Sequence, residues 1–418
     1  MTNFLTVKTA EEVLALIEGF EPLAPERVGL HGAVGRILAE AITAPESVPH
    51  FNRALMDGFA VRARDTFGAS ESQPALLRDG GEVKMGEACV PEGLPGNAIA
   101  IPTGAMVPAG TDSVVMIEYT SRLDSESIEV MKPVAPGENI LLAGEDIQAG
   151  QPVFSTGHFL RPQDIGVLAV LGIDSVKVYC KPRVAILSTG DEIVPVSTIA
   201  LPPGKIRDIN SYTLAAQVLE VGAITGTIEV VGDDLDCLVA ACRRALADHD
   251  VILISGGSSV GVRDLTVLAL DSLAEADLLV HGVAVRPGKP TILARAGRKI
   301  LWGLPGHPIS AMTICRTFVL PCLYSLQGLK GKPAWKDAGA ERAVLTRKLP
   351  SVHGRTDYVP VVLRETPEGL AATPVFGKSA MIGALARSDG YIVIDRHVEG
   401  LDAGAEVRVH LFHANLGR

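Results

Sequence analysis

Aromatic residues are scarce in this sequence, at 4% of 418 residues. The cores must therefore be aliphatic, built from Val, Ile, Leu and Ala side chains rather than from large rings. Apolar residues still make up 47% of the chain, and low-complexity repeats are absent, which excludes an intrinsically disordered protein. At roughly 100–200 residues per domain, this length predicts a soluble globular protein with two to four domains.

Cysteine is also sparse, and no Cys-x-x-Cys pair occurs. The cysteines lie mostly in apolar settings, where a free thiol behaves as a small hydrophobic group. We therefore interpret them as reduced core thiols rather than zinc or iron–sulfur ligands, and expect a cytoplasmic protein. They are Cys89, Cys180, Cys237, Cys242, Cys315 and Cys322.

The chain has no excess of positive charge, because 38 Lys and Arg face 48 Asp and Glu for a formal net charge of −10. Without a long basic run, general binding to nucleic acid or to an anionic membrane surface is not expected. No apolar run approaches the roughly 18–20 residues that span a bilayer, and the N-terminal residues do not resemble a signal peptide.

Patterning divides the chain into three regions. The first contains a helix at 9–20, with Thr9 and Glu12 spaced as a capping box, and then short apolar runs and turns to about 180, interrupted by a helix at 161–172. The second, 183–326, alternates strands with helices, which predicts a parallel sheet covered on both faces. In its last helix, at 307–326, Pro321 should bend or interrupt the chain. After a polar linker at 328–340, alternating runs at 356–363 and 405–412 predict a small β domain.

Three glycine-containing loops, at 188–192, 255–264 and 304–310, follow strands of the middle region. Loops in these positions meet at the carboxyl edge of a parallel sheet, where backbone N–H groups can bind a phosphate. Four carboxylates follow the same strands and loops, at Asp191, Glu192, Asp233 and Asp264. Oxygen ligands of this kind suit Mg²⁺ bound together with a phosphate, and the alternative for each is a helix N-cap.

Cations and hydroxyls gather in three later turns. Arg286 and Lys289 bracket a Pro-Gly turn, Arg355 follows a glycine, and Lys378 and Ser379 lie between strands. Two cations so close together repel unless an anion lies between them, and solvated turns are the alternative. The residues alone therefore indicate a metal-dependent enzyme that acts on a phosphorylated ligand and binds a second oxyanion nearby.

Eight motifs in order along the chain resemble the MoeA family of molybdopterin molybdenumtransferases, which includes the E domain of gephyrin. They are MDGFAVR (56–62), PTGAMVPAGTDSVV (102–115), GED (144–146), PRVAILSTGDEI (182–193), SGGSSVG (255–261), RPGKP (286–290), LPGHPISA (304–311) and the late Gly-Arg and Lys-Ser pairs. The implied fold is an elongated, multidomain α/β subunit of a homodimer. A MogA-like doubly wound α/β domain III would comprise 1–25 with 181–328, an extended domain I 26–48 with 148–180, a β-rich domain II 49–147 and a β domain IV 329–418.

The implied reaction inserts molybdate into the dithiolene of adenylylated molybdopterin and releases AMP with the help of Mg²⁺. The enzyme that adenylates the pterin is an expected partner. Catalysis would rest on Asp233, Asp264, Arg286, Lys289, Arg355 and Ser379, with Asp191, Glu192 and Asp264 on the metal. The substrates would be bound by Asp57, Thr103, Asp146, Ser188, Gly190, Ser255, Gly256, Gly257, Ser259, Pro290, Ser310 and Lys378, the first three reaching the partner subunit's cleft.

The sequence departs from the family pattern at four places. Arg53-Ala54-Leu55-Met56 stands where Asn-Ser-Ala-Met is usual, Ser258 replaces Val, Arg286 replaces Lys and His307 replaces Asn. Arg in place of Lys keeps the charge but changes its geometry, so tungstate is an alternative oxyanion. His307 could donate a proton or be a structural, hydrogen-bonded residue. A gephyrin-like scaffold without catalysis and a pterin-adenylating enzyme are the other functional alternatives.

Overall fold

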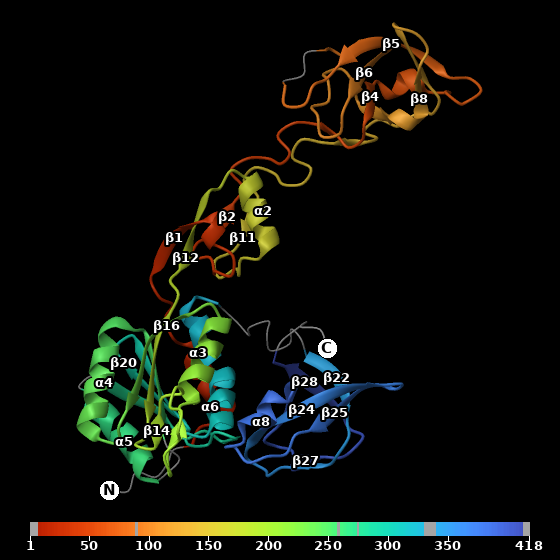
Figure 1. Ribbon diagram of the computed structural model, residues 1–418. Coiled ribbons are helices and arrows are strands. Elements are labelled where there is room, and N and C mark those ends of the chain that lie inside the picture. The colour runs from red at the N-terminus through yellow and green to blue at the C-terminus, as the bar shows by residue number, and fades with distance from the viewer. Residues whose placement is uncertain (1–6, 88–90, 257–259, 274–275, 330–339, 413–418) are drawn as a thin grey trace.

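The structure, a computed structural model, describes residues 7–87, 91–256, 260–273, 276–329 and 340–412. Figure 1 shows an elongated molecule in which an α/β domain and a C-terminal β domain lie side by side. A narrow arm rises from the α/β domain and carries a β-rich tip domain at its far end. The expected elongated, multidomain α/β architecture is therefore confirmed, whereas the residue boundaries of the four domains stay predictions.

The central sheet of the α/β domain has the strand order β16-β13-β17-β21-β20-β18. Its strands are β13 (Arg183–Thr189), β16 (Ile224–Val231), β17 (Val251–Gly256), β18 (Ala276–His281), β20 (Ile292–Ala296) and β21 (Lys299–Leu304). The first four strands in this order are parallel, as predicted, but β20 pairs antiparallel with both of its neighbours, β21 and β18. The prediction of a wholly parallel sheet was wrong at this edge, because the two residues between β20 and β21 allow a hairpin but no crossover.

Helices cover both faces of this sheet, as the strand–helix alternation predicts. On one face lie α1 (Ala10–Glu18), α3 (Asn210–Glu220), α6 (Pro308–Ile314) and α7 (Leu320–Leu326), and on the other α4 (Leu235–Asp248) and α5 (Val260–Asp271). The two cores are mainly aliphatic, as the shortage of aromatics requires. The capping box of α1 is confirmed, since the Thr9 hydroxyl accepts from the Glu12 N–H at 3.2 Å and the Glu12 carboxylate accepts from the Thr9 N–H at 2.6 Å.

A single helical stretch, Pro308–Leu326, joins α6 to α7 through a π-helical turn at Cys315–Val319. Pro321 follows that turn and the helix continues through it to Leu326, so the proline does not interrupt the helix; proline has no N–H to donate, and a shift in the hydrogen-bond ladder accommodates it. The stretch is long and apolar enough to pass for a membrane span, contrary to the expectation that no segment would be. Its hydrophobic window is 72% buried inside the protein, which identifies it as a core helix.

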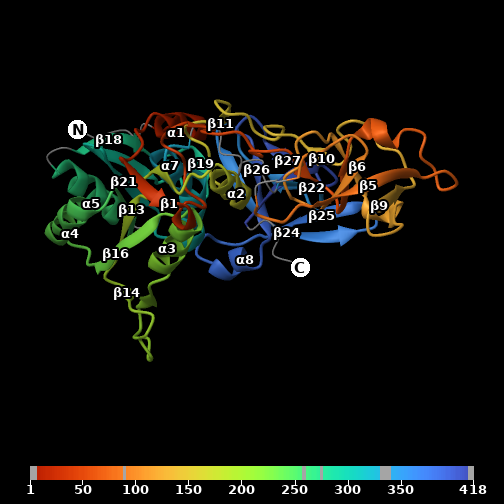
Figure 2. The same ribbon diagram turned by 90° about the horizontal axis from the view of Figure 1, so that it is seen from above.

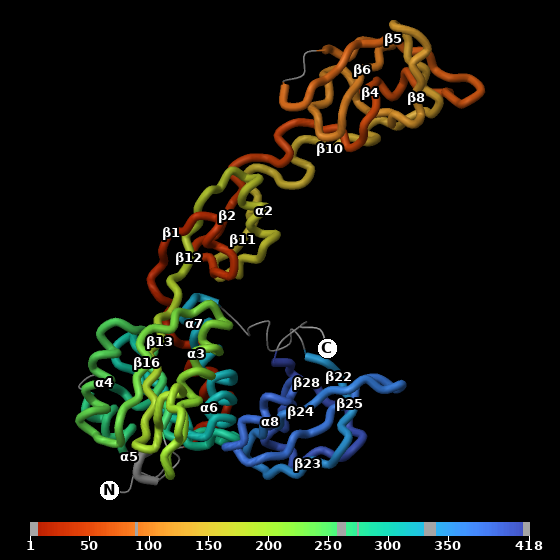
Figure 3. The backbone as a smooth tube through the Cα atoms, in the orientation of Figure 1, coloured from red at the N-terminus to blue at the C-terminus, as the bar shows by residue number. Residues whose placement is uncertain are grey.

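The arm and the tip domain are built mostly from short strands, and Figure 3 shows the chain running out along the arm to the tip and back again. The arm pairs β1 (Pro25–Gly29) with β12 (Ser175–Tyr179) and β2 (Ile42–Thr43) with β11 (Pro152–Phe154), and packs α2 (Pro162–Val170) against them. The tip sheet has the order β7-β4-β6-β5-β9-β8, and β3 pairs with β10 beside it. Its strands are β3 (Arg53–Ala54), β4 (Gly58–Val61), β5 (Ala75–Glu82), β6 (Asn97–Ile101), β7 (Ser113–Met116), β8 (Thr120–Arg122), β9 (Ser127–Val130) and β10 (Ile140–Leu141).

The C-terminal domain contains a six-stranded sheet with the order β19-β24-β25-β22-β28-β26, flanked by α8. Its elements are β22 (Ala340–Leu345), β23 (Leu349–Pro350), β24 (Thr356–Thr366), β25 (Gly369–Pro374), α8 (Ile382–Ala386), β26 (Gly390–Ile394), β27 (Gly400–Leu401) and β28 (Glu406–Leu411). The edge strand β19 (Val285–Arg286) comes from the α/β domain and pairs in parallel with β24. This exchange fixes the two domains together at the segment that carries the Arg-Pro-Gly-Lys-Pro motif.

Candidate functional site

A pocket of about 60 Å³ opens at the carboxyl ends of β13 and β17. The chain leaves β13 toward β16 on one side and returns to β17 on the other, so this point is the topological switch of the sheet. Ligands of open α/β sheets bind at such a point. The lining comes from three of the loops singled out in the sequence and from the start of α3: Thr189, Glu192, Ile193, Ile206, Arg207, Asp208, Ile209, Asn210, Ser255, Gly256, Gly306 and Pro308.

Buried polar side chains form the floor of this pocket. Asn210 donates from Nδ2 to the Ser255 hydroxyl at 2.7 Å and to the Gly306 carbonyl at 2.9 Å, while its Oδ1 is buried without a partner among the described residues. The Ser188 hydroxyl donates to Asp208 Oδ1 at 3.2 Å and lies 2.9 Å from the Ser211 hydroxyl. The floor is therefore rigid, and both predicted serines are held in its network.

Two carboxylates face each other on neighbouring loops at the pocket's edge. Asp191 Oδ1 accepts from the Asp233 N–H at 3.1 Å, and the Asp191 N–H points back at Asp233 Oδ2 at 3.4 Å. Gly190 has a φ of +150°, and a Cβ there would lie 2.7 Å from the Glu192 carboxylate, so the turn requires glycine. Burial raises the pKa of Asp233, and the nearby Asp191 and Glu192 carboxylates add to the rise, against the hydrogen bond from Asp191.

These carboxylates do not form a complete metal site alone. Among the described residues, no three His, Cys, Asp or Glu side chains are grouped closely enough to hold an ion. Asp233 Oδ1 is nevertheless buried without a hydrogen-bond partner, an arrangement that a cation would relieve. Gly257, Ser259 and the side chain of Asp264 lie outside the described residues, although the backbone of Asp264 belongs to α5.

Two arginines converge on one buried carboxylate where the α/β and C-terminal domains meet. Arg355 donates to Asp357 through Nε at 2.7 Å and through Nη2 at 3.2 Å, and Arg286 Nη1 lies 3.9 Å from the same carboxylate. The pairing of β19 with β24 sets Arg286 directly opposite Asp357, whose side chain is 4% exposed. The Arg286 side chain is 65% exposed and the Arg355 side chain 29%, so both retain a face toward solvent.

Hydroxyls and lysines complete this junction. Ser310 is buried in the first turn of α6, and the next domain's Ser379 accepts from the Ile309 N–H through its carbonyl at 3.1 Å. The Ser379 hydroxyl lies 2.8 Å from His307 Nδ1, so His307 is hydrogen-bonded, and its role as a proton donor or a structural residue stays a prediction. Lys289 and Lys378 are exposed, and Pro290 is half-buried beside Lys289.

Three predicted residues lie in the tip region, at the far end of the molecule from this junction (Figure 1). Asp57 Oδ1 accepts from the Thr103 N–H at 2.6 Å and from its hydroxyl at 2.8 Å, and these bonds lower the pKa of Asp57, the backbone bond most. Asp57 and Asp146 are both exposed. They therefore lie on a surface far from the residues Arg286, Arg355 and Asp357 of the same subunit.

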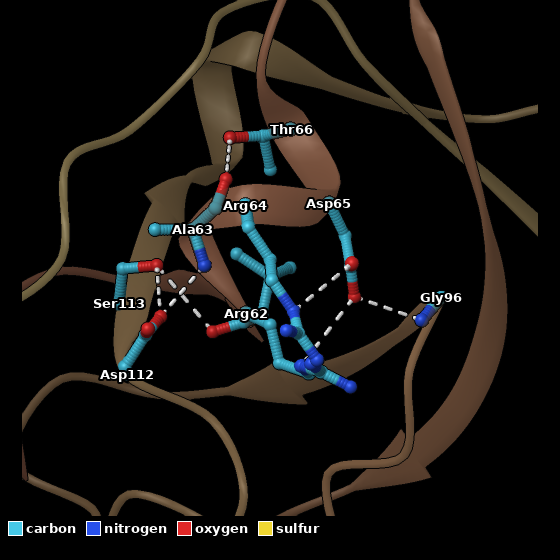
Figure 4. A network of polar contacts seen from close by, with 9 residues as sticks. Arg62, Ala63, Arg64, Asp65, Thr66, Gly96, Asp112 and Ser113 are labelled. Carbon is cyan, nitrogen blue, oxygen red and sulfur yellow. Dashed lines mark hydrogen bonds and ion pairs between the residues drawn. The ribbon is translucent and has the colours of Figure 1, made fainter.

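The MDGFAVR motif that contains Asp57 ends at Arg62, and the residues around Arg62 form a structural network of polar contacts (Figure 4). Asp112 Oδ1 accepts from the Ala63 N–H at 2.6 Å, and Asp65 Oδ2 accepts from the Gly96 N–H at 2.8 Å. Arg62 Nε lies 3.9 Å from Asp65 Oδ2 inside this network. The motif therefore begins at the exposed carboxylate of Asp57 and ends at hydrogen bonds and an ion pair that hold the tip domain together.

Sequence reasoning missed Asp208, Asn210 and Asp357 as parts of the two sites. Asp357 follows Arg355 by two residues where the chain enters β24, a spacing that places two side chains on one side of an extended segment, and that spacing was the available signal. Asp208 lies two residues before α3 and Asn210 is the first residue of α3, so sequence patterns do not separate them from an ordinary helix start.

Three family models match the chain in order along its length. They are the MoeA N-terminal region (domain I and II) over residues 5–172, the "Probable molybdopterin binding domain" over 185–325 and the MoeA C-terminal region (domain IV) over 342–412.

Named relatives match over nearly their whole lengths. The molybdopterin molybdenumtransferase of Bacillus subtilis is 35% identical over 94% of this chain and 91% of its own. That of Haemophilus influenzae is 31% identical over 95% and 96%. The solved structure of the molybdopterin biosynthesis MoeA protein from Pyrococcus horikosii aligns with a TM-score of 0.80 and 37% identity, covering 98% of this chain and 100% of that one.

Proposed function

Since the chain belongs to the MoeA family of molybdopterin molybdenumtransferases, we propose that it inserts molybdate into the dithiolene of adenylylated molybdopterin and releases AMP. The observation that carries this proposal is the loop between β21 and α6. Its Gly306 carbonyl lies in the pocket at the carboxyl ends of β13 and β17, here called the strand-end pocket. The adjacent His307 contacts Ser379 at the domain boundary where Arg286 and Arg355 meet Asp357, here called the cationic junction. A substrate with a phosphate at one end and a metal acceptor at the other could therefore contact both sites.

In the strand-end pocket, Asp191, Glu192, Asp233 and Asp264 are the proposed Mg²⁺ and pyrophosphate side of the reaction. Asp191, Glu192 and Asp264 would hold the ion, and Ser188, Gly190, Ser255, Gly256, Gly257 and Ser259 would position the phosphates. The orphaned oxygen of Asp233 and the carboxylates that crowd it support an ion here. Mg²⁺ usually keeps waters and bridges carboxylates to phosphate, which suits a partial ligand set, and it would neutralise charge on the pyrophosphate as AMP leaves.

At the junction, the substrate oxyanion would be held by cations and hydroxyls. Arg286, Lys289, Arg355 and Lys378 outnumber the one buried carboxylate, Asp357. The forks of Arg286 and Arg355 suit a tetrahedral oxyanion, and Ser310, Ser379 and Pro290 would complete the pocket. Tungstate has the same charge and shape as molybdate, so it is an alternative substrate for the same residues.

The proposed enzyme is a homodimer, because the arm holds Asp57, Thr103 and Asp146 away from their own subunit's junction (Figure 1). If these residues act on substrate, they act in the cleft of a second copy. An exposed apolar surface on the α/β domain supports self-association: the edge strand β16 exposes Ile224, Ile228 and Val230, and the neighbouring loop between β14 (Ile193–Val194) and β15 (Ile206–Arg207) projects with Ile199 96% exposed (Figure 2). The buried thiols of Cys242, Cys315 and Cys322 suit the cytoplasm.

The direct test is turnover of adenylylated molybdopterin by the purified protein. We expect AMP release that requires Mg²⁺ and molybdate and stops when EDTA removes the metal. Asp264→Asn should weaken Mg²⁺-dependent turnover while circular dichroism stays unchanged. Synthesis of adenylylated pterin from ATP, or no turnover by the folded protein, would contradict the proposal.

The dimer is tested separately by mixing two impaired variants at a molybdate concentration too low for either of them to turn over. Asp57→Ala removes the tip carboxylate, and Arg355→Ala removes the junction fork. If the sites are shared between subunits, unfolding and refolding a mixture should restore up to about half of the sites in mixed dimers, one wild-type site in each. Mixtures no more active than their components would show that the tip acts elsewhere.

A further inference from the structure

A second and larger pocket, of about 390 Å³, lies between the α/β domain and the C-terminal domain. Helices α3 and α6 form one wall, and α8 with strands of the C-terminal sheet forms the other, in the region where Figure 1 shows α6 lying between α3 and α8. Both α3 and α6 begin at the strand-end pocket and extend away from it, and the two pockets share no lining residue. This pocket has no part in the reaction proposed above.

One buried polar atom in its lining has no partner. Gln217 on α3 is 5% exposed, and its Nε2 donates to the Met312 carbonyl at 3.3 Å. Its Oε1 is buried and accepts no hydrogen bond from any described residue. A buried acceptor left unpaired destabilises the folded protein, so a ligand that donates a hydrogen bond to Gln217 would recover that energy.

The rest of the lining selects against a charged ligand. Its cation and its anion neutralise each other, since Arg316 Nη1 lies 3.2 Å from Glu220 Oε2. Arg316 also donates to the Phe412 carbonyl at 2.6 Å and stacks over the Phe412 ring at 5.3 Å. The hydroxyls of Thr313 and Thr317 donate to carbonyls of their own helix, at 2.7 and 2.8 Å, so they do not donate to Gln217.

The C-terminal wall is aromatic, although the chain as a whole is poor in aromatic residues. Tyr358, Tyr391 and Phe412 all line the pocket, and the ring of Tyr391 lies 6.0 Å from that of Tyr358 and 5.8 Å from that of Phe412. Grouped rings favour a flat partner that stacks or packs edge-on against them. The volume falls within the roughly 300–1,000 Å³ typical of small-molecule sites.

From these observations we infer that the pocket between α3, α6 and the C-terminal sheet binds a small, neutral aromatic heterocycle that donates a ring N–H to Gln217 Oε1. The aromatic rings favour a flat ligand, and the Arg316–Glu220 ion pair disfavours a charged one. The unpaired Oε1 of Gln217 requires that the ligand donate a hydrogen bond. Because the two walls belong to different domains, the bound molecule links them and stabilises the junction.

Indole is the probe for this site, and 1-methylindole is its matched control, because methylation removes the N–H donor and keeps the rings. Calorimetric titration of the full-length protein should give about tenfold weaker binding for 1-methylindole. Saturating indole should also raise the melting temperature. Equal binding of the two probes, or no binding of either, would overturn the inference.

Two variants locate the site. Gln217→Met keeps the length of the side chain without the acceptor and should weaken indole about tenfold while leaving 1-methylindole unchanged. Ala386→Trp, at an exposed lining position, should block both probes, whereas Gln148→Met on the arm should affect neither. If Gln217→Met does not fold, Gln217→Glu supplies the comparison, since it keeps an acceptor and should keep the preference for indole. Displacement of indole by AMP, or unchanged binding in Ala386→Trp, would show that the probe binds elsewhere.

Discussion

Two buried aspartates, one in the arm and one in the C-terminal domain, are each held by the fork of a nearby arginine. In the arm, Asp164 is 2% exposed and accepts from Arg161 Nε at 3.0 Å and Nη2 at 2.9 Å. It also accepts from the Arg161 N–H at the start of α2, and His158 Nε2 lies 2.9 Å away. At the junction, Asp357 is 3% exposed and is gripped in the same way by Arg355.

The difference lies in what surrounds each pair. The carboxylate of Asp164 is saturated by its own segment, so the arm cluster is closed and has one function, to fix the start of α2. Asp357 is shared with Arg286, and among the described residues neither Lys289 nor Lys378 forms an ion pair. The same interaction is therefore structural where the charges balance, and we expect it to favour binding of an anion where cations are in excess.

The strongest test of this comparison is to remove each arginine in turn. Arg355→Ala should raise the molybdate concentration needed for half-maximal turnover about ten- to a hundredfold, because a charge-assisted hydrogen bond contributes about 1.5–3 kcal/mol. Arg161→Ala should leave that concentration unchanged. Product formation is followed while molybdate and tungstate are titrated separately.

Arg355→Lys is the control for loss of the fold, since it keeps the charge and removes only the fork. It should give an intermediate loss of oxyanion affinity with a near-normal melting temperature. If Arg355→Ala and Ser379→Ala need no more oxyanion than the unchanged protein, the arginine is a structural residue like Arg161, and the proposed contrast fails.

The next largest effect concerns stability rather than activity. Asp164→Asn should lower the free energy of unfolding by about 1–2 kcal/mol, because it weakens bonds to a partly exposed arginine. Hydrogen bonds from Arg161 hold the pKa of Asp164 well below its ordinary value of 3.8. A depressed folded pKa means that this stabilisation is complete above pH 3.8 and is lost as the pH falls below it.

Denaturant titrations at neutral pH and below pH 3.8 measure this difference. Turnover by Asp164→Asn at neutral pH should be unchanged. The gap in stability between the variant and the unchanged protein should shrink in the acid range. A gap that persists there would mean that packing, and not ionisation, explains the effect.

Local sequence patterns predicted most of the α/β domain because its elements are set by short-range physics. Thr9 and Glu12 define the start of α1, and the strand–helix alternation predicts that β13, β16 and β17 are parallel strands. Strand β18 and the antiparallel strand β20 were missed, and so was β19. A two-residue strand that pairs across a domain boundary carries no periodicity, so its partner cannot be inferred from its own sequence.

The candidate site was predicted in its residue types but not in its pairing. Arg286 and Arg355 were identified as oxyanion ligands, yet their common counter-ion Asp357 was not, because the two arginines are brought together only by the pairing of β19 with β24. Long-range strand pairing is a tertiary effect that propensities do not encode. Whether these residues bind substrate stays a prediction.

Asp357 is the counter-ion that Arg286 and Arg355 share, so removing its charge should strengthen oxyanion binding at the junction. Asp357→Asn takes away a negative charge beside the proposed oxyanion, worth about 1 kcal/mol at a few ångströms in a wet environment, so molybdate should bind about fivefold more tightly. The gain should shrink as salt is added. The measurement is half-saturation by molybdate at low and high ionic strength.

Weaker binding by Asp357→Asn would mean that the carboxylate acts chiefly by orienting Arg355. The matched variant Asp164→Asn separates the two cases from a general loss of stability, since it disturbs an arginine fork without a ligand. It should leave half-saturation by molybdate unchanged at both salt concentrations.

The smallest expected effect concerns the histidine in each region. His307 contacts Ser379 at the junction, and His158 contacts Asp164 while stacking on Phe154 at 4.6 Å. His307→Ala removes one hydrogen bond of about 0.5–1 kcal/mol that positions the Ser379 hydroxyl, so oxyanion affinity should fall about threefold. His307→Asn offers an amide in the same place and should restore most of the loss. His158→Ala should instead lower the melting temperature without changing oxyanion affinity. If His307→Ala shows that same pattern, His307 is a structural residue like His158 and does not help to form the proposed oxyanion site.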